Sequence, residues 1–201
     1  MVKIKLGILI SGNGSNMQAI ANSCQNCGIL ADIATVAVVI SNNPQAKGLQ
    51  WAEKQGLATA VVDHKSFALA TNPRLEFEQK LYQILQQYSV DLVCLAGFMR
   101  LLTPFFVNAW YDRLINIHPS LLPDFKGANA VSDAFLAKVK IVGCTTHFVR
   151  EQMDSGPIIL QQSLVVNEDD TLESLKTRIL ALEHQIYPQT IKIICNKILQ
   201  N

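Results

Sequence analysis

The chain has 201 residues, of which 49% are apolar and 16% charged, and 17 basic against 16 acidic residues give a net charge of +1. This length and composition are typical of one globular domain with a sizeable core. The balanced charge argues against a nucleic-acid-binding protein. Apolar stretches such as 35–40 are much shorter than the roughly 20 residues of a membrane helix, and the apolar start is too short for a signal sequence. We therefore expect a soluble, cytoplasmic protein.

Strand and helix signals alternate through the first half of the chain. The predicted strands cover residues 3–10, 34–41, 58–62 and 91–96. The predicted helices cover 15–23, 45–54 and 75–88. Residues 64–73 lack periodicity and are expected to form a surface loop. Alternation of this kind predicts βαβ units and a parallel sheet.

The second half departs from this alternation. A helix after Pro104 leads to a strand that ends at His118, and a polar loop over 123–129 follows. The remaining predicted elements are a helix at 131–138, strands at 139–149 and 158–165, and a final helix at 171–196 whose apolar side is interrupted at Pro188. The pattern predicts one compact α/β domain with a changed topology in its second half.

The five cysteines do not suggest a disulfide framework, because their number is odd and Cys94 and Cys144 lie in apolar runs. Cys24 and Cys27 have redox or zinc spacing, but no second pair of ligands completes a four-ligand site. We expect no metal.

A glycine-containing loop, Ser11 to Asn16, follows the first strand directly. Glycines permit a tight turn, and the next helix offers unpaired amide groups to an anion. The loop lacks the third glycine of a dinucleotide fingerprint and the lysine of a P-loop, which argues against NAD and ATP. It is either a phosphate site or a plain strand-to-helix turn.

The strand predicted over 91–96 is followed by Gly97 and Arg100, at the same predicted sheet edge. Glycine lets a ligand approach the backbone closely. Arg100 could bind an acidic ligand or be solvated. Its apolar neighbours Met99, Leu101 and Leu102 could wall a flat ring system or belong to the core.

Two polar side chains, Asn116 and His118, lie two residues apart at the end of a buried strand and so face the same way. Ligands bind at this edge of open α/β sheets. Asp154 lies in a turn between two later strands. Paired with His118, it would favour the imidazolium and make a proton donor; alternatively it caps its turn, and the polar pair faces water.

The other histidines are weaker candidates. His147 lies in a strand and could face the site or the core, His64 should be exposed, and His184 should have a packing or capping role in the last helix. No nucleophile elbow appears.

Four motifs, GNGSN, LAGFMR, NIHPSLLP and DSGPIILQ, occur in this order and closely resemble the glycinamide ribonucleotide formyltransferases, within the wider folate-dependent formyltransferase family. The resemblance spans essentially the whole chain. It implies a Rossmann-like, mostly parallel mixed sheet flanked by helices. It also implies one domain over 1–201, with a phosphate-binding half at about 1–100 and a folate-binding and catalytic half at about 101–201.

The resemblance further implies an activity: transfer of a formyl group from 10-formyltetrahydrofolate to the amine of a phosphoribosyl glycinamide in purine biosynthesis, without a metal. Matched residue by residue, the catalytic positions are Asn116, His118 and Asp154. The ribonucleotide-binding positions are Gly14, Ser15, Asn16 and Glu183. The folate-binding positions are Arg74, Met99, Arg100, Leu101, Leu102, Asn116 and Val149. We expect a monomer or homodimer.

Three alternative functions are less well supported by the sequence. A methionyl-tRNA formyltransferase is expected to carry an additional carboxyl-terminal RNA-binding domain, and a formyltetrahydrofolate deformylase an amino-terminal regulatory domain. A non-enzymatic nucleotide or folate-binding module would bind ligand without forming product. Residues 124–127 vary in the family, and the loop at 123–129 is expected to be mobile.

Overall fold

The computed structural model describes residues 2–25 and 27–200, and its centre is one seven-stranded sheet. The strands are β1 (Ile4–Ile10), β2 (Ala34–Ser41), β3 (Thr59–Val61), β4 (Leu92–Leu95), β5 (Leu114–His118), β6 (Ile141–Phe148) and β7 (Ile158–Val165). They lie in the order β3-β2-β1-β4-β5-β6-β7. Neighbouring strands from β3 to β5 pair in parallel. β6 pairs antiparallel with β5, and β7 pairs antiparallel with β6. The predicted α/β fold with a mostly parallel mixed sheet is confirmed.

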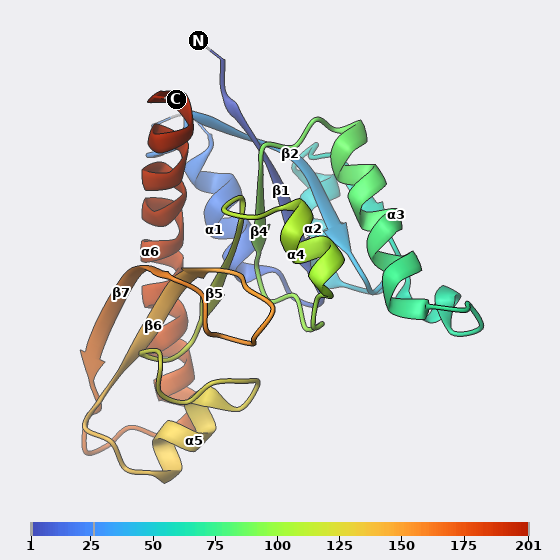
Figure 1. Cartoon of the computed structure of the whole chain (residues 1–201). Coiled ribbons are helices and arrows are strands. Elements are labelled where there is room, and N and C mark those ends of the chain that lie inside the picture. Colours follow the sequence, from blue (N-terminus) through green and yellow to red (C-terminus); the bar gives the residue numbers. More distant parts are fainter. Residues whose placement is uncertain (1, 26, 201) are drawn as a thin grey trace.

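Helices cover both faces of the sheet (Figure 1). They are α1 (Ser15–Ser23), α2 (Lys47–Lys54), α3 (Pro73–Gln87), α4 (Pro104–Ala109), α5 (Ala130–Leu136) and α6 (Leu172–Gln200), with a short 3-10 helix, η1 (His64–Phe67). α1, α2 and α6 share one core layer with the sheet, and α3 and α4 share the other. No described helix has the length and hydropathy needed to cross a membrane.

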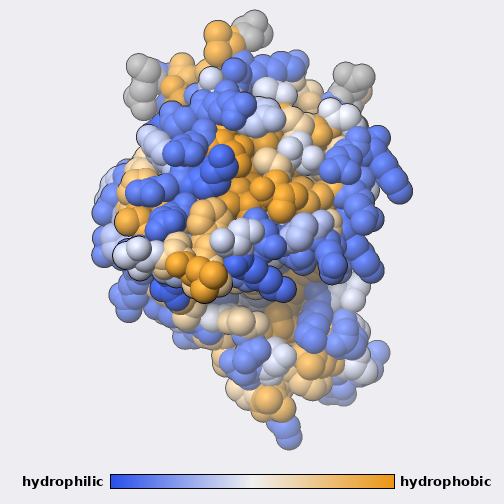
Figure 2. Space-filling view, turned by 90° about the vertical axis from the view of Figure 1, so that its right-hand side faces the viewer, coloured by the Kyte–Doolittle hydropathy of each residue, from blue (hydrophilic) through white to orange (hydrophobic). Residues whose placement is uncertain are grey.

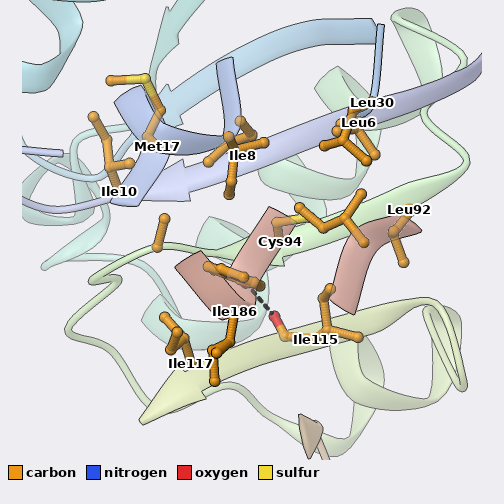
Figure 3. Packing of buried hydrophobic residues seen from close by; sticks show 14 of the residues in the cluster. Leu6, Ile8, Ile10, Met17, Leu30, Leu92, Cys94, Ile115, Ile117 and Ile186 are labelled. Carbon is orange, nitrogen blue, oxygen red and sulfur yellow. Dashed lines mark hydrogen bonds between the residues drawn. The ribbon is translucent and has the colours of Figure 1, made fainter. Parts of the chain in front are cut away.

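The central strands are apolar runs because they are buried on both sides. In β1, Leu6, Ile8 and Ile10 face the α6 layer together with Ile115 and Ile117 of β5 (Figure 3). Leu9, between them, packs into the α3 layer. This alternation uses the period of two of a β-strand, so a single strand supplies both cores.

The final helix is predicted over 171–196, with its apolar side interrupted at Pro188. It forms as α6, which runs unbroken through Pro188 to Gln200, and Pro188 is itself buried with its neighbours. Proline removes one backbone hydrogen bond, but the residues around it are buried against the sheet. The Tyr187 hydroxyl also lies 2.9 Å from the Leu95 carbonyl oxygen and 3.2 Å from that of Ile115. Tertiary contacts therefore hold the helix where local propensity would not.

The segment predicted as a loop at 64–73 is also partly ordered. It contains η1, and α3 begins at Pro73 rather than at 75. The Asn72 side chain caps α3 by accepting the Leu75 amide hydrogen at 3.4 Å. Asparagine followed by proline is a helix-start signal.

Candidate active site at the carboxyl edge of the sheet

The strands β1, β4 and β5 end at the same edge of the sheet, since they run parallel. Two cavities open there. We call the first, of about 350 Å³, the apolar cavity; it is lined by residues from 95–102, 116–119, 127–128 and 147–154. The second, of about 520 Å³, is the glycine-loop cavity; it is lined by residues from 11–16, 96–99, 117–132 and 176–183.

The predicted catalytic residues meet at the apolar cavity. His118 Nδ1 lies 3.5 Å from Asp154 Oδ2, and both side chains are almost fully buried. Asn116 Nδ2 lies 3.3 Å from the Nε2 of His147. His147 Nε2 is also 3.6 Å from Asp154 Oδ1. The four side chains therefore form one polar cluster. The sequence left open whether His147 faces the site or the core, and the structure places it in this cluster.

Strand register explains why these residues meet. β5 pairs with β6 so that Asn116 lies opposite His147 and His118 opposite Thr145. Opposed side chains on one face of an antiparallel pair are close neighbours. Asp154 then reaches back from the turn after β6, with its backbone in the left-handed region at φ 49°. Gly156 permits this turn, because a Cβ there would lie 1.7 Å from the Phe148 carbonyl oxygen.

The two histidines differ in their hydrogen-bond partners. His118 Nε2 lies 2.8 Å from the Phe125 carbonyl oxygen, and its Nδ1 faces the Asp154 carboxylate. A ring protonated on both nitrogens satisfies both acceptors. Burial lowers the pKa of His147, although its bond to the Phe148 carbonyl opposes this effect. This shift favours the neutral ring, in which Nδ1 donates to that carbonyl at 2.9 Å and Nε2 accepts from Asn116.

The loop at 123–129, expected to be mobile, makes backbone hydrogen bonds to this cluster. The Gly127 amide donates to Asp154 Oδ2 at 2.9 Å. The Ser120 hydroxyl donates to the Asp124 carbonyl at 2.6 Å. With the Phe125 contact to His118, these bonds tie the loop to the acid and to the imidazole of the pair.

The predicted phosphate loop forms one end of the glycine-loop cavity. Gly14 precedes α1 with φ +72°, a left-handed conformation that favours glycine. The loop packs closely on α2: the Gly48 amide donates to the Gly12 carbonyl at 3.0 Å. A Cβ on Gly14 would lie 3.1 Å from Gly48 Cα. The close packing fixes the loop so that the amides of α1 open into the cavity, where an anion can bind.

Glu183 reaches this cavity from the far end of the sequence. The Asn16 side chain donates to Glu183 Oε2 at 2.7 Å. Burial raises the pKa of Glu183 to about 7, although the bond from Asn16 opposes this rise. The structure thus brings together Gly14, Ser15, Asn16 and Glu183, as their motifs predicted, and all four line the cavity.

Most of the predicted folate residues line the apolar cavity. Met99, Arg100, Leu101, Leu102, Asn116 and Val149 all do so. Met99 and Leu101 are 73% and 57% exposed, so they are not core residues. The side of the molecule that carries α3 and α4 shows a patch of apolar side chains among polar ones (Figure 2). Arg74, in the first turn of α3, is exposed and lies outside the described lining of this cavity.

Several supporting residues carried no sequence signal. Glu78 of α3 is buried and accepts hydrogen bonds from the amide and hydroxyl of Thr103, which precedes α4. Burial raises the pKa of Glu78. Arg150 stacks over Tyr111 at 4.1 Å and pairs with Asp112 at 2.5 Å. These contacts hold two parts of the cavity lining in place: Leu102, which precedes Thr103, and Arg150.

The remaining histidines lie away from the cluster. His64 is half-buried rather than exposed, and its Nδ1 lies 3.0 Å from the Asn42 carbonyl oxygen. His184 is half-buried in α6, and burial lowers its pKa.

Burial raises the pKa of Cys24 to about 11, which disfavours the reactive thiolate.

Known proteins share this architecture. The phosphoribosylglycinamide formyltransferase of Bacillus subtilis is 40% identical over 188 residues, 94% of this chain and 93% of that protein. The trifunctional purine biosynthetic protein adenosine-3 of Gallus gallus is 41% identical over 98% of this chain. This chain spans only 19% of that relative's length.

Solved structures and a family model agree with these relatives. The crystal structure of glycinamide ribonucleotide transformylase 1 from Symbiobacterium toebii has a TM-score of 0.90 and 44% identity, covering 97% of this chain and 89% of that one. The family model described as formyl transferase matches residues 4–191. The chain therefore belongs to the formyl transferase family.

Proposed function

We propose that this protein transfers the formyl group of 10-formyltetrahydrofolate to the amine of glycinamide ribonucleotide, yielding formylglycinamide ribonucleotide and tetrahydrofolate in purine biosynthesis. The names of the relatives with high coverage support this assignment. One structural observation carries it: two cavities share a wall, and the His118–Asp154 pair lines the apolar cavity beside that wall, with His118 between the shared residues Ile117 and Pro119. Gly97, Met99, Ile117, Pro119 and Ala128 line both cavities. This is the geometry that transfer between two bound ligands requires.

The glycine-loop cavity would hold the ribonucleotide. Its phosphate would bind the amides at the start of α1, with Ser15 and Asn16, where the helix dipole favours an anion. Glu183, held by Asn16 in the same cavity, would contact the glycinamide ribonucleotide and help direct its amine toward the shared wall.

The apolar cavity would hold the folate. Its exposed methionine and leucine side chains offer apolar surface to a flat ring, and the turn from Val149 to Asp154 would wrap that ring. Arg100, whose guanidinium lies 5.2 Å over the Phe77 ring, would bind an acidic group of the folate. Arg74 would reach the same acidic tail from outside the cavity.

In the proposed reaction the substrate amine attacks the formyl carbon and generates a tetrahedral centre with an oxyanion. Preorganised donors stabilise such charge most effectively. We assign this role to the Asn116 amide and to His118, whose Nε2 hydrogen would move from the Phe125 carbonyl to the oxyanion. The bond from carbon to the folate nitrogen then breaks. Asp154, through a water, would carry the amine proton to that nitrogen.

A direct assay tests this proposal. The protein is mixed with 10-formyltetrahydrofolate, with and without glycinamide ribonucleotide, and the release of tetrahydrofolate is followed. Release that requires the ribonucleotide, together with formylated ribonucleotide as product, is expected. Equal release without ribonucleotide would indicate a deformylase, and ligand binding without any release would indicate a binding module.

We further propose that residues 1–201 act as one domain, in the cytoplasm, as a monomer or homodimer that binds these two small molecules and neither nucleic acid nor a membrane. Both cavities draw residues from before and after position 100, which supports a single functional unit. Light scattering during gel filtration, at the protein concentration of the assay, would give the oligomeric state.

A further inference from the structure

Ser11, the residue after β1, connects three strand ends through its hydroxyl and its amide. The hydroxyl donates to Asn42 Oδ1, after β2, at 2.6 Å. The same oxygen accepts the Met99 amide hydrogen, after β4, at 2.8 Å. The Ser11 amide donates to the Gly97 carbonyl at 3.2 Å. One serine therefore holds the segment 97–99 at both of its ends.

This segment belongs to the wall between the two proposed ligands. Gly97 and Met99 line both cavities, whereas Ser11 lines only the glycine-loop cavity among the described lining residues. A displacement of Gly97–Met99 would consequently shift the folate relative to the ribonucleotide.

The segment has few other restraints. Gly97 has φ +72° and open space where a Cβ would be. The Met99 side chain is 73% exposed, so its packing cannot fix the backbone. Phe98 is buried in the α3 layer and anchors the middle. The Met99 amide thus depends on Ser11 for its position on the cavity side.

The direction of the hydrogen bonds is settled by chemistry. A backbone amide can only donate, so the Ser11 oxygen must accept from Met99. Its own hydrogen is then free for Asn42 Oδ1, an acceptor. Asn42 is buried and packs against His64 through its amide and carbonyl. Ser11 is therefore oriented by a buried partner before any ligand binds.

We propose that Ser11 is a positioning residue for formyl transfer: through the Met99 amide it sets the shared wall, and with it the distance between the substrate amine and the formyl carbon. This inference rests on the proposed function. A misplacement of about 1 Å can lower a rate about 100-fold while each ligand still binds. The signature is therefore a loss in kcat that exceeds the loss in either affinity.

The test compares Ser11→Ala with the native full-length protein. Steady-state kinetics give kcat, and calorimetry gives separate dissociation constants for glycinamide ribonucleotide and for tetrahydrofolate. We expect kcat to fall about 10- to 100-fold, with each dissociation constant changing less than about threefold. Ser11→Thr, which keeps a hydroxyl, should retain more activity than Ser11→Ala.

The matched control is Ser23→Ala. The Ser23 hydroxyl also makes a half-buried hydrogen bond, 2.8 Å to the Ala19 carbonyl, but within α1 and outside the described lining of both cavities. It should keep native kcat. If Ser11→Ala does not fold, Ser11→Cys, which places a somewhat larger and weaker acceptor at the same position, should show the same loss in kcat.

The outcomes separate the two proposals. If the native protein transfers the formyl group and Ser11→Ala has the same kcat, the positioning role alone is overturned. A loss in affinity as large as the loss in kcat also overturns it, because Ser11 would then act as an ordinary binding residue. A native protein without formyl transfer refutes the proposed function, and the positioning role with it.

Discussion

The two cavities at the carboxyl edge are built by different means. The glycine-loop cavity depends on backbone: amides at the start of α1 and two glycines, Gly14 and Gly48, in close contact. The apolar cavity depends on side chains that three separate segments, β5, β6 and the turn at Asp154, bring to one cluster. The difference teaches that the proposed anion site uses the backbone of one local turn, held in place by its contact with α2, whereas the proposed catalytic centre requires the assembled sheet.

The largest effect, a loss in kcat, is expected for a change in the side-chain cluster. Asp154→Asn keeps the shape of the carboxylate but removes the charge beside His118. We expect kcat to fall about 100- to 1,000-fold with near-native affinity for both ligands. Asp91→Asn is the control, because Asp91 also accepts a backbone amide hydrogen, from Lys5 at 2.8 Å, at the opposite edge of the sheet. Near-native turnover in Asp154→Asn would remove that residue from the mechanism.

The second prediction concerns the buried carboxyl of the glycine-loop cavity. Burial raises the folded-state pKa of Glu183 from 4.5 to about 7. Between these two pH values the folded state binds more protons than the unfolded state. The contribution of Glu183 to the free energy of unfolding is therefore largest below pH 4.5 and is lost as the pH rises through 7. The loss from this group is on the order of 3 kcal/mol.

Urea denaturation at pH 5 and pH 8 measures this loss. Glu183→Gln should reduce the difference in unfolding free energy between the two pH values. Glu173→Gln, on the exposed side of the same helix, should leave it unchanged. An equal pH difference in native protein and Glu183→Gln would contradict the assignment.

The third prediction tests the backbone construction of the anion site. A Cβ on Gly48 would lie 2.6 Å from Ile10 Cδ1 and 3.2 Å from the carbonyl oxygens of Gly12 and Asn13. Overpacking of about 1–3 kcal/mol would displace the loop. Gly48→Ala should therefore raise the KM for the ribonucleotide about 10-fold and leave the KM for the folate unchanged. Gln50→Ala, on the exposed side of α2, should change neither.

The smallest effect is expected at the rim of the apolar cavity. Met99 is largely exposed, so it can contribute only the apolar area that a bound folate covers. Met99→Ala should raise the folate KM about two- to fivefold, equivalent to about 1 kcal/mol or less. Leu136→Ala is the matched control, since Leu136 is 77% exposed on α5 and outside the described cavity linings. Equal effects in both variants would show that the wall is nonspecific.

The fold was largely predictable from sequence. Strands such as 34–41 are dense in β-branched residues, and helices are bounded by glycine, proline and asparagine signals. The burial of Pro188 within α6 was not predictable, because it depends on long-range contacts of the helix, including those of Tyr187 to two strands. Propensity does not contain such contacts.

The candidate site was predictable in part. Asn116 and His118 follow from the period of a strand, and the glycine loop from local turn chemistry. The pairing of Asp154 with His118 was only one of two alternatives, and the hydrogen bond from Asn16 to Glu183 had no signal, because 36 and 167 residues separate these pairs. Gly48 and Glu78 carried no signal, and Ser11 was marked only as the first residue of the glycine loop, since the importance of all three lies in what packs against them.

The antiparallel pairing of β5 with β6 has a consequence for how the site tolerates changes in strand register. The polar cluster forms only when Asn116 meets His147 in the correct register, and a slip of one residue would turn the β6 partner to the opposite face. A shift in the register of β6 should therefore abolish the proposed formyl transfer and leave the glycine loop, with which β6 does not pair, in its conformation.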